Sequence, residues 1–289
     1  MRSRKNLSTK NYSPSFMSKF YVVIILLFFY LPIFSVMVFS FNSAGSATRF
    51  ESFSLKWYVT MMKNDELLNA VQVTVTIAIL ATLISTILGV LGSLGLAELN
   101  KKYKGWTNFI LNINNLPVVN PDIVTAVSLM ALFMSLSAVF SFGYTTMLLA
   151  HIAFCTPYVV IQVYPKVLAL DPSEQEAAMD LGATRFQSIV KVVLPDLSPA
   201  IISGAMMAFT MSFDDFVISY FVGGKVSNIS TYVYSMRRFK PEVNALSTLI
   251  FLFIGIILVF FEFYQFHKER NDDDDVKRTK SKKIVVSNC

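Results

Sequence analysis

The residues in this sequence with the clearest capacity for chemistry are two adjacent carboxylates, Asp214 and Asp215, inside an otherwise apolar run. A carboxylate is costly within a membrane and usually faces a cavity or a partner. Phe213, Phe216 and Tyr220 lie nearby, and aromatic faces attract cations. Adjacent residues point about 100° apart on a helix, so we expect only one of the two acids to face such a cavity. Two interpretations stay open. The acids attract a cation, or they have a structural role in ion pairing, in capping a helix break or at a position nearer the membrane interface.

The other polar residues near or within apolar runs are predicted to be structural. His151 has no second histidine near it, which favours a hydrogen bond between helices over metal binding or proton relay. Cys155 is expected to pack as a small residue, and Glu98 and Glu262 are expected to lie at the membrane interface. The sequence contains no P-loop, GxSxG, HExxH or Cys/His cluster with metal-ligand spacing. We therefore predict no catalytic residue and no metal site in this chain.

Composition places the chain in the membrane class. Of its 289 residues, 54% are hydrophobic and only 15% are charged, and the mean hydropathy is +0.55. A soluble protein carries roughly a quarter charged residues and has no single core that hides this much apolar surface. We therefore attribute the net charge of +6 to basic residues that flank membrane helices on the cytoplasmic side, and expect no nucleic acid as a partner. Two cysteines are too few for a disulfide framework.

Six apolar runs predict an all-α, polytopic membrane protein with about six transmembrane helices. The predicted spans cover residues 20–41, 69–96, 123–140, 144–163, 197–222 and 245–266. They define a transmembrane domain over residues 1–266.

Two of these runs have features of their own. Gly89, Gly92 and Gly95 close the second run, and small residues let helix backbones approach closely. Pro117 and Pro121 precede the third run, which indicates either a span broken at the prolines or an interfacial segment followed by one span over 123–140. We favour the second alternative.

The distribution of basic residues predicts the orientation. If both termini are cytoplasmic, eighteen Lys and Arg residues lie inside and seven lie outside. Lys and Arg are enriched on the cytoplasmic side of membrane proteins. The bias persists, at thirteen to seven, when the charged end of the chain is discounted. Residues 166–196 are then cytoplasmic, and residues 267–289 are expected to form a disordered, charged cytoplasmic tail.

The cytoplasmic segment, residues 166–196, contains residues that typically start and end helices. Asp171 before Pro172 supplies a helix N-cap and a proline at the first helical position, whereas Ser173 with Glu176 offers a competing capping box. Gly182 is suited to end this helix because glycine tolerates a left-handed backbone. A second apolar face at helical spacing follows, made by Phe186, Ile189, Val190 and Val193 before Pro195. The pattern predicts two short helices joined at a glycine, which together form a compact knob.

Residues 176–195, EAAMDLGATRFQSIVKVVLP, carry a resemblance to a known family. Glu176-Ala177-Ala178, then Gly182 and then Leu194-Pro195 are similar in spacing to the EAA motif of bacterial ABC importer permeases, with Val192 in place of the usual isoleucine. Residues 120–133, 151–160, 209–224 and 241–248 resemble the second permease subunits of spermidine/putrescine importers. The resemblance covers roughly residues 15–265, while residues 267–289 match no pattern of that family.

The resemblance implies a type I importer fold in which a cytoplasmic coupling helix docks on an ATPase. The residues implied in ATPase coupling are Glu176, Ala177, Ala178, Gly182, Leu194 and Pro195, and the substrate path would include Asp214, Asp215, Phe213 and Tyr220. The implied partners are a second permease, two cytoplasmic ABC ATPase subunits, an extracytoplasmic polyamine-binding protein and the lipid bilayer. No cofactor is expected in this chain, because ATP and Mg²⁺ would be bound by the ATPase.

Three alternatives remain at this stage. A permease for another cation or small solute would carry the same motif. A secondary, ion-coupled carrier is the alternative from a different class, although no convincing internal repeat is present. Glu176 would also be favoured by a capping box alone, with no partner.

Overall fold

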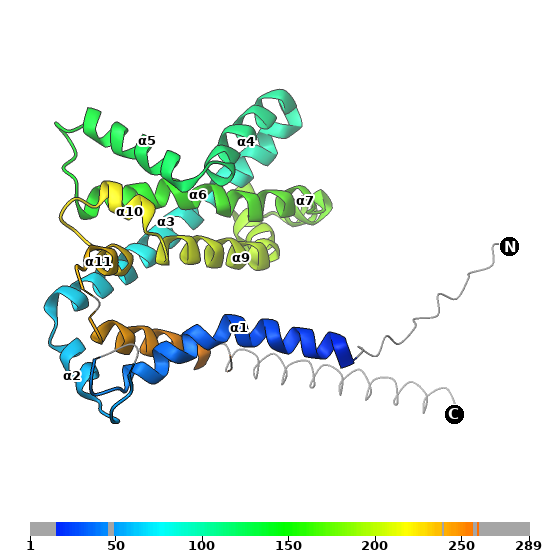
Figure 1. Cartoon of the computed structure of the whole chain (residues 1–289). Helices are drawn as coiled ribbons and strands as arrows, with labels where there is room; N and C mark the ends of the chain where they lie inside the picture. Colours follow the sequence, from blue (N-terminus) through cyan, green and yellow to red (C-terminus); the bar gives the residue numbers. More distant parts are fainter. Residues whose placement is uncertain (1–15, 46–48, 239, 257–258, 260–289) are drawn as a thin grey trace, which may run out of the picture. The chain divides into compact units, whose positions relative to one another are not determined.

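The computed structural model describes residues 16–45, 49–238, 240–256 and 259 (Figure 1). Within these residues every regular element longer than a single bridge is a helix, which confirms the all-α prediction. The chain divides into two units, one formed by residues 1–63 with 238–289 and the other by residues 64–237.

The first unit contains α1 (Phe16–Ser40), α2 (Lys56–Met62) and the helix Glu242–Ile256. α1 is long and apolar enough to cross a membrane, and its side chains are exposed over most of its length, as expected for a surface that faces lipid. The loop between α1 and α2 is pinned by Asn42, whose Nδ2 donates to the Arg49 carbonyl and whose carbonyl accepts from Trp57 Nε1. The predicted sixth span, 245–266, is described to residue 256 and at residue 259, and the rest lies outside the described residues.

The second unit is built around three long segments. These are α3 (Asp65–Lys102), α6 (Tyr144–Leu168) and the continuous run Arg185–Phe213, which comprises α8 (Arg185–Ser188), the π-helical turn η1 (Ile189–Val193) and α9 (Leu194–Phe213). With α1, they are the four helices among the described residues that are long and apolar enough to span a membrane. α3, α6 and α9 pack against one another and enclose most of the buried core (Figure 1).

Two glycines allow these three helices to meet at Val159. A methyl group added to Gly89 of α3 would lie 2.6 Å from Val159 Cβ on α6, and one added to Gly204 of α9 would lie 3.3 Å from Val159 Cα. The prediction of a close approach is therefore confirmed for Gly89. At Gly92 and Gly95 an added methyl would meet no described atom within 4 Å, so these two glycines make no close helix contact within the described part of this chain.

The predicted third span differs most from the structure. α4 (Lys104–Val119) and α5 (Asp122–Ser135) are separate helices bent by 108° at their junction, so residues 123–140 contain the shorter helix α5 followed by turns. Asn120 is extended, with φ −76° and ψ 148°, because Pro121 disfavours a helical conformation of the residue before it. The bent pair is one broken span or a re-entrant segment. This is closer to the less favoured of the two predictions, a span broken at the prolines, than to a single span over 123–140.

Candidate functional site

The cytoplasmic segment begins with α7 (Pro172–Asp180), which starts as predicted. Asp171 Oδ1 accepts a hydrogen bond from Ser173 N at 3.0 Å, with Pro172 at the first helical position. This backbone hydrogen bond lowers the pKa of the exposed Asp171 carboxyl. The competing capping box of Ser173 and Glu176 is not adopted, so Glu176 is an exposed residue on the helix surface and not its cap.

Gly182 ends α7 in the left-handed region, with φ +91°. Gly182 N donates to the Met179 carbonyl and Ala183 N donates to the Ala178 carbonyl, which is the Schellman arrangement that satisfies helix-end carbonyls. Thr184 and Gln187 then form a capping box that starts α8. Two helical segments joined at a glycine are thus confirmed.

The second segment does not end before Pro195, contrary to the prediction. It continues through η1 into α9, and Pro195 lies in the first turn of α9. Proline has no N–H to donate to the carbonyl four residues earlier. The π turn directly before it spaces its hydrogen bonds one residue wider, as in the bond from Leu194 N to the Ile189 carbonyl, and so accommodates the proline within one continuous segment.

The knob formed by α7, Gly182 and α8 presents apolar side chains to its surroundings. Leu181 is 91% exposed and Phe186 is 75% exposed. Glu176, Ala177 and Pro195 are exposed as well, whereas Ala178 and Leu194 are partly buried. Large exposed apolar side chains outside a lipid-facing helix are characteristic of protein interaction sites.

An ion pair holds the knob to α3 behind it, and a hydrogen bond joins the two helices of the knob to each other. Arg185 Nη2 lies 3.1 Å from Glu98 Oε1 of α3, and Ser188 Oγ donates to the Gln175 carbonyl at 3.4 Å. A pocket of about 220 Å³ lies between the ends of α3 and α6, α7 and η1, and Glu98, Arg185 and Val192 are among its lining residues. Because both charged side chains are more than half exposed, the Glu98–Arg185 pair stabilises the knob only weakly.

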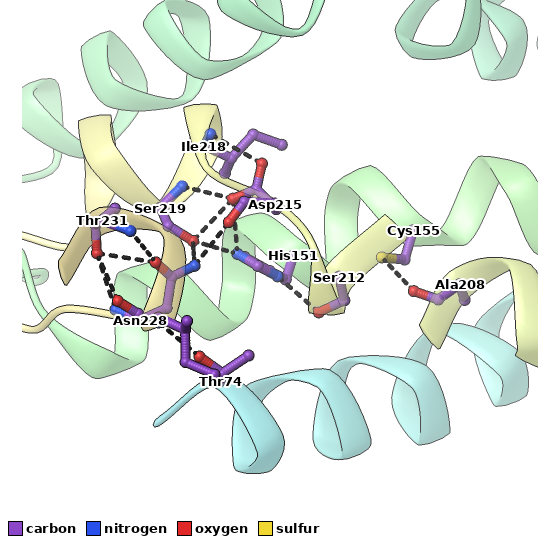
Figure 2. A network of polar contacts seen from close by, with 11 residues as sticks. Thr74, His151, Cys155, Ala208, Ser212, Asp215, Ile218, Ser219, Asn228 and Thr231 are labelled. Atoms are coloured by element: carbon purple, nitrogen blue, oxygen red, sulfur yellow. Dashed lines mark hydrogen bonds and ion pairs between the residues drawn. The ribbon is translucent and has the colours of Figure 1, made fainter. Parts of the chain in front are cut away.

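Asp214 and Asp215 lie at a break between helices and not within one. α9 ends at Phe213, and α10 (Val217–Val222) begins after three intervening residues (Figure 2). Asp215 is 9% exposed, and its carboxylate accepts from Ile218 N, Ser219 N and Ser219 Oγ at 2.8–3.1 Å. Asp214 is exposed. Only Asp214 of the two acids is exposed, and because the chain breaks at this point the helical spacing behind the prediction does not apply. That one of them faces a translocation path stays a prediction.

His151 of α6 connects both sides of the break (Figure 2). Its Nδ1 lies 2.7 Å from Ser212 Oγ in α9, and its Nε2 lies 3.0 Å from Ser219 Oγ in α10 and 3.4 Å from Asp215 Oδ2. The predicted hydrogen bond between helices is thereby confirmed. Cys155, also on α6, is fully buried and donates to the Ala208 carbonyl, in keeping with its predicted packing role.

Asn228 extends the network to two further helices. It caps α11 (Ile229–Ser235) through its Oδ1, which accepts from Thr231 N, and its Nδ2 donates to the Asp215 carbonyl and to Ser219 Oγ. Thr74 Oγ1 of α3 accepts from Ile229 N at 2.8 Å. Sequence reasoning missed Ser219 and Asn228, although polar residues bordering or inside an apolar run are the signal that would have indicated them.

Three aromatic rings gather on α10, α11 and the residue before α10. The Tyr234 ring centroid lies 4.8 Å from that of Phe216 and 5.6 Å from that of Tyr220, and both tyrosines are more than half exposed. Tyr220 was predicted and Tyr234 was not. Phe213 stacks on Phe209 at 5.6 Å and is not part of this trio, because it is the last residue of α9.

Comparison with known proteins places this geometry in context. Residues 89–271 match the family described as "Binding-protein-dependent transport system inner membrane component". The putrescine transport system permease protein PotI of Escherichia coli (strain K12) is 35% identical over 93% of this chain and 99% of its own length. The spermidine/putrescine transport system permease protein PotC of the same strain is 35% identical over 86% of this chain and 94% of its own length.

Solved structures share the fold. A chain in the crystal structure of a bacterial ABC transporter involved in the import of the acidic polysaccharide alginate matches with a TM-score of 0.63 at 16% identity, covering 85% of this chain and 91% of that chain. A chain of the alginate ABC transporter in complex with its alginate pentasaccharide-bound periplasmic protein matches with a TM-score of 0.62 at 18% identity, covering 85% and 90%. At these identities the likeness concerns the fold alone.

Proposed function

Because this chain belongs to the family of binding-protein-dependent transport system inner membrane components, we propose that it moves polyamines across the cell membrane as a permease subunit of an ATP-driven importer. The support for polyamines is that relatives named as putrescine and spermidine/putrescine permeases are 35% identical over most of the chain. The chain itself is a multi-pass membrane subunit of an ABC importer and not an enzyme.

The working assembly contains several other chains. This permease pairs with a second permease, two cytoplasmic ATPase subunits bind and hydrolyse Mg-ATP, and an extracytoplasmic binding protein delivers the polyamine. Both termini are cytoplasmic in this arrangement, in line with the excess of basic residues on that side. One similar structure contains a periplasmic protein, which fits delivery by a separate chain.

The single observation that carries the proposal for ATPase coupling is the exposed knob around Gly182. Leu181 and Phe186 offer apolar surface, and Glu176 offers a carboxylate beside them. A groove of the ATPase that covers this knob would bury the apolar side chains and transmit its own movement to α9. Ala177, Ala178, Leu194 and Pro195 set the shape of the knob and its junction with α9.

Co-purification tests the coupling. ATPase subunits should remain bound to the wild-type permease and be lost from Glu176→Lys and from Gly182→Val. Glu66→Lys is the matched control, because it makes the same charge reversal on an exposed residue at the opposite end of α3. Retention of the ATPase by both knob variants would contradict the proposal, and ion-driven transport by the permease alone would favour a secondary carrier.

For the cation path, we propose that Asp214 and the aromatic trio of Phe216, Tyr220 and Tyr234 attract the ammonium groups of the cargo. Asp214 is exposed, whereas the carboxylate of Asp215 is occupied by α10. Uptake of labelled spermidine by the reconstituted importer should have a raised KM in Asp214→Asn. Unchanged uptake in Asp214→Asn and in Asp215→Asn, at normal expression, would refute a role for this pair.

A further inference from the structure

The buried network at the helix break leaves little freedom in where its protons lie. Ser219 Oγ carries one hydrogen, and it donates this hydrogen to Asp215 Oδ2 at 2.8 Å. Asn228 Nδ2 is also a donor, and it gives a hydrogen bond to Ser219 Oγ at 2.9 Å. The third contact of Ser219 Oγ, with His151 Nε2 at 3.0 Å, therefore requires the imidazole to donate. Ser212 Oγ has no other hydrogen-bond partner among the described residues, so its hydroxyl donates to a bare Nδ1 at 2.7 Å and the ring is neutral.

From this we infer that His151 is a positioning residue of the transport path: a neutral imidazole with its proton on Nε2 fixes the helix break that presents Asp214 and the aromatic trio. The ring accepts from the last turn of α9 and donates to the first turn of α10, so a single rigid group sets the spacing of the two helices (Figure 2). Asp215 lies 3.4 Å from the same Nε2, and its carboxylate accepts from two amides in the first turn of α10. Its carboxylate therefore belongs to the support, whereas Asp214 faces outward.

The geometry is specific to histidine. His151 is 1% exposed, so each hydrogen bond that is lost leaves a polar atom without solvent. Glutamine reaches the Nε2 position and restores a donor to Ser219, but it leaves Ser212 without its acceptor. Asparagine reaches only the Nδ1 side, and leucine restores neither bond. A role in packing alone would make leucine as good a replacement as glutamine.

The direct test is the protonation pattern of the ring. The chain has two histidines, His151 and His267, so difference spectra of the isotope-labelled importer in lipid, wild type minus His151→Gln, isolate the buried ring. Solid-state nitrogen resonances should show a bare Nδ1 and a protonated Nε2, and Ser212→Ala should retain the protonated Nε2. A bare Nε2 in the wild type would overturn the inference.

Transport kinetics supply the second test and rest on the proposed polyamine cargo. The KM for labelled spermidine should rise about tenfold or more in His151→Asn and in His151→Leu, with a smaller rise in His151→Gln, because only glutamine restores the bond to Ser219. Equal kinetics for leucine and glutamine would reduce His151 to a packing residue. Absence of spermidine uptake by the wild type would refute the proposed function, and the resonance pattern would still decide the inference about His151.

Discussion

The contact of α3 with α6 at Gly89 allows a quantitative test of the packing. A methyl group at this position would lie 2.6 Å from both Cβ and Cγ1 of Val159. Carbon atoms in favourable contact are separated by about 3.5–4.0 Å, so Gly89→Ala requires the helices to part by roughly 1 Å. Val159 is unable to retreat easily, because its χ1 angle is restricted in a helix and Gly204 of α9 lies against its other side. Overpacking of this kind costs about 1–3 kcal/mol.

A matched variant on the same helix isolates this cost. Gly92→Ala gains the same helix propensity, about 0.8–1.0 kcal/mol, and its methyl meets no described atom within 4 Å. The two variants should therefore differ by the overpacking cost alone, about 1–3 kcal/mol, with Gly92→Ala the more stable. The measurement is the thermal midpoint of the purified importer in detergent at one heating rate, with Gly95→Ala as a second control. A midpoint for Gly89→Ala equal to or above that of Gly92→Ala would refute this account of the α3–α6 contact.

Three further predictions concern the cytoplasmic segment. Gly182→Ala places a side chain at φ +91° at a cost of about 1–3 kcal/mol, and it should lower transport more than it lowers the yield of folded protein in membranes. The depressed pKa of Asp171 means that its cap contributes fully above the usual carboxyl range and is lost as pH falls through the lowered pKa. The protection of the Ser173 amide against hydrogen exchange, measured relative to its intrinsic rate at each pH, should then fall, and in Asp171→Ala it should be low at neutral pH as well. Glu98→Ala removes an exposed ion pair with Arg185, so thermal unfolding should show a loss below about 1 kcal/mol, and a larger loss would contradict the weak pairing.

The start and end of α7 were predicted correctly because neighbouring residues determine them. The start of α7 depends on Asp171 and Pro172, and its end depends on Gly182. Each of these residues lies within a few residues of the helix end that it determines. Capping, proline placement and left-handed glycine act over a single helical turn, so neighbouring residues are sufficient to indicate them. The continuation past Pro195 was missed because a π turn depends on how the following helix is held in the bundle.

Tertiary contacts explain what the sequence did not indicate. The break after Phe213 lies inside one apolar run, and hydropathy alone predicts an unbroken span there. It is stabilised by His151, which precedes the break by more than sixty residues, and by Asn228, which follows it. Tyr234 joins Tyr220 only because α11 folds back beside α10. Such pairings become visible only once the helices are placed in space.

The two candidate sites are joined by one element, and this bears on how movement at one would reach the other. α9 contains twenty residues, which corresponds to about 30 Å of helix, and it lies between the π turn of η1 at the knob and the break held by Asp215. A packed helix moves as a rigid body, whereas irregular backbone at its ends absorbs changes in φ and ψ. A displacement of the knob would thus carry α9 with it and stretch or bend the hydrogen bond between Ser212 and His151. We therefore expect variants of His151 to alter the ATP hydrolysed per cargo molecule as well as the KM for the cargo.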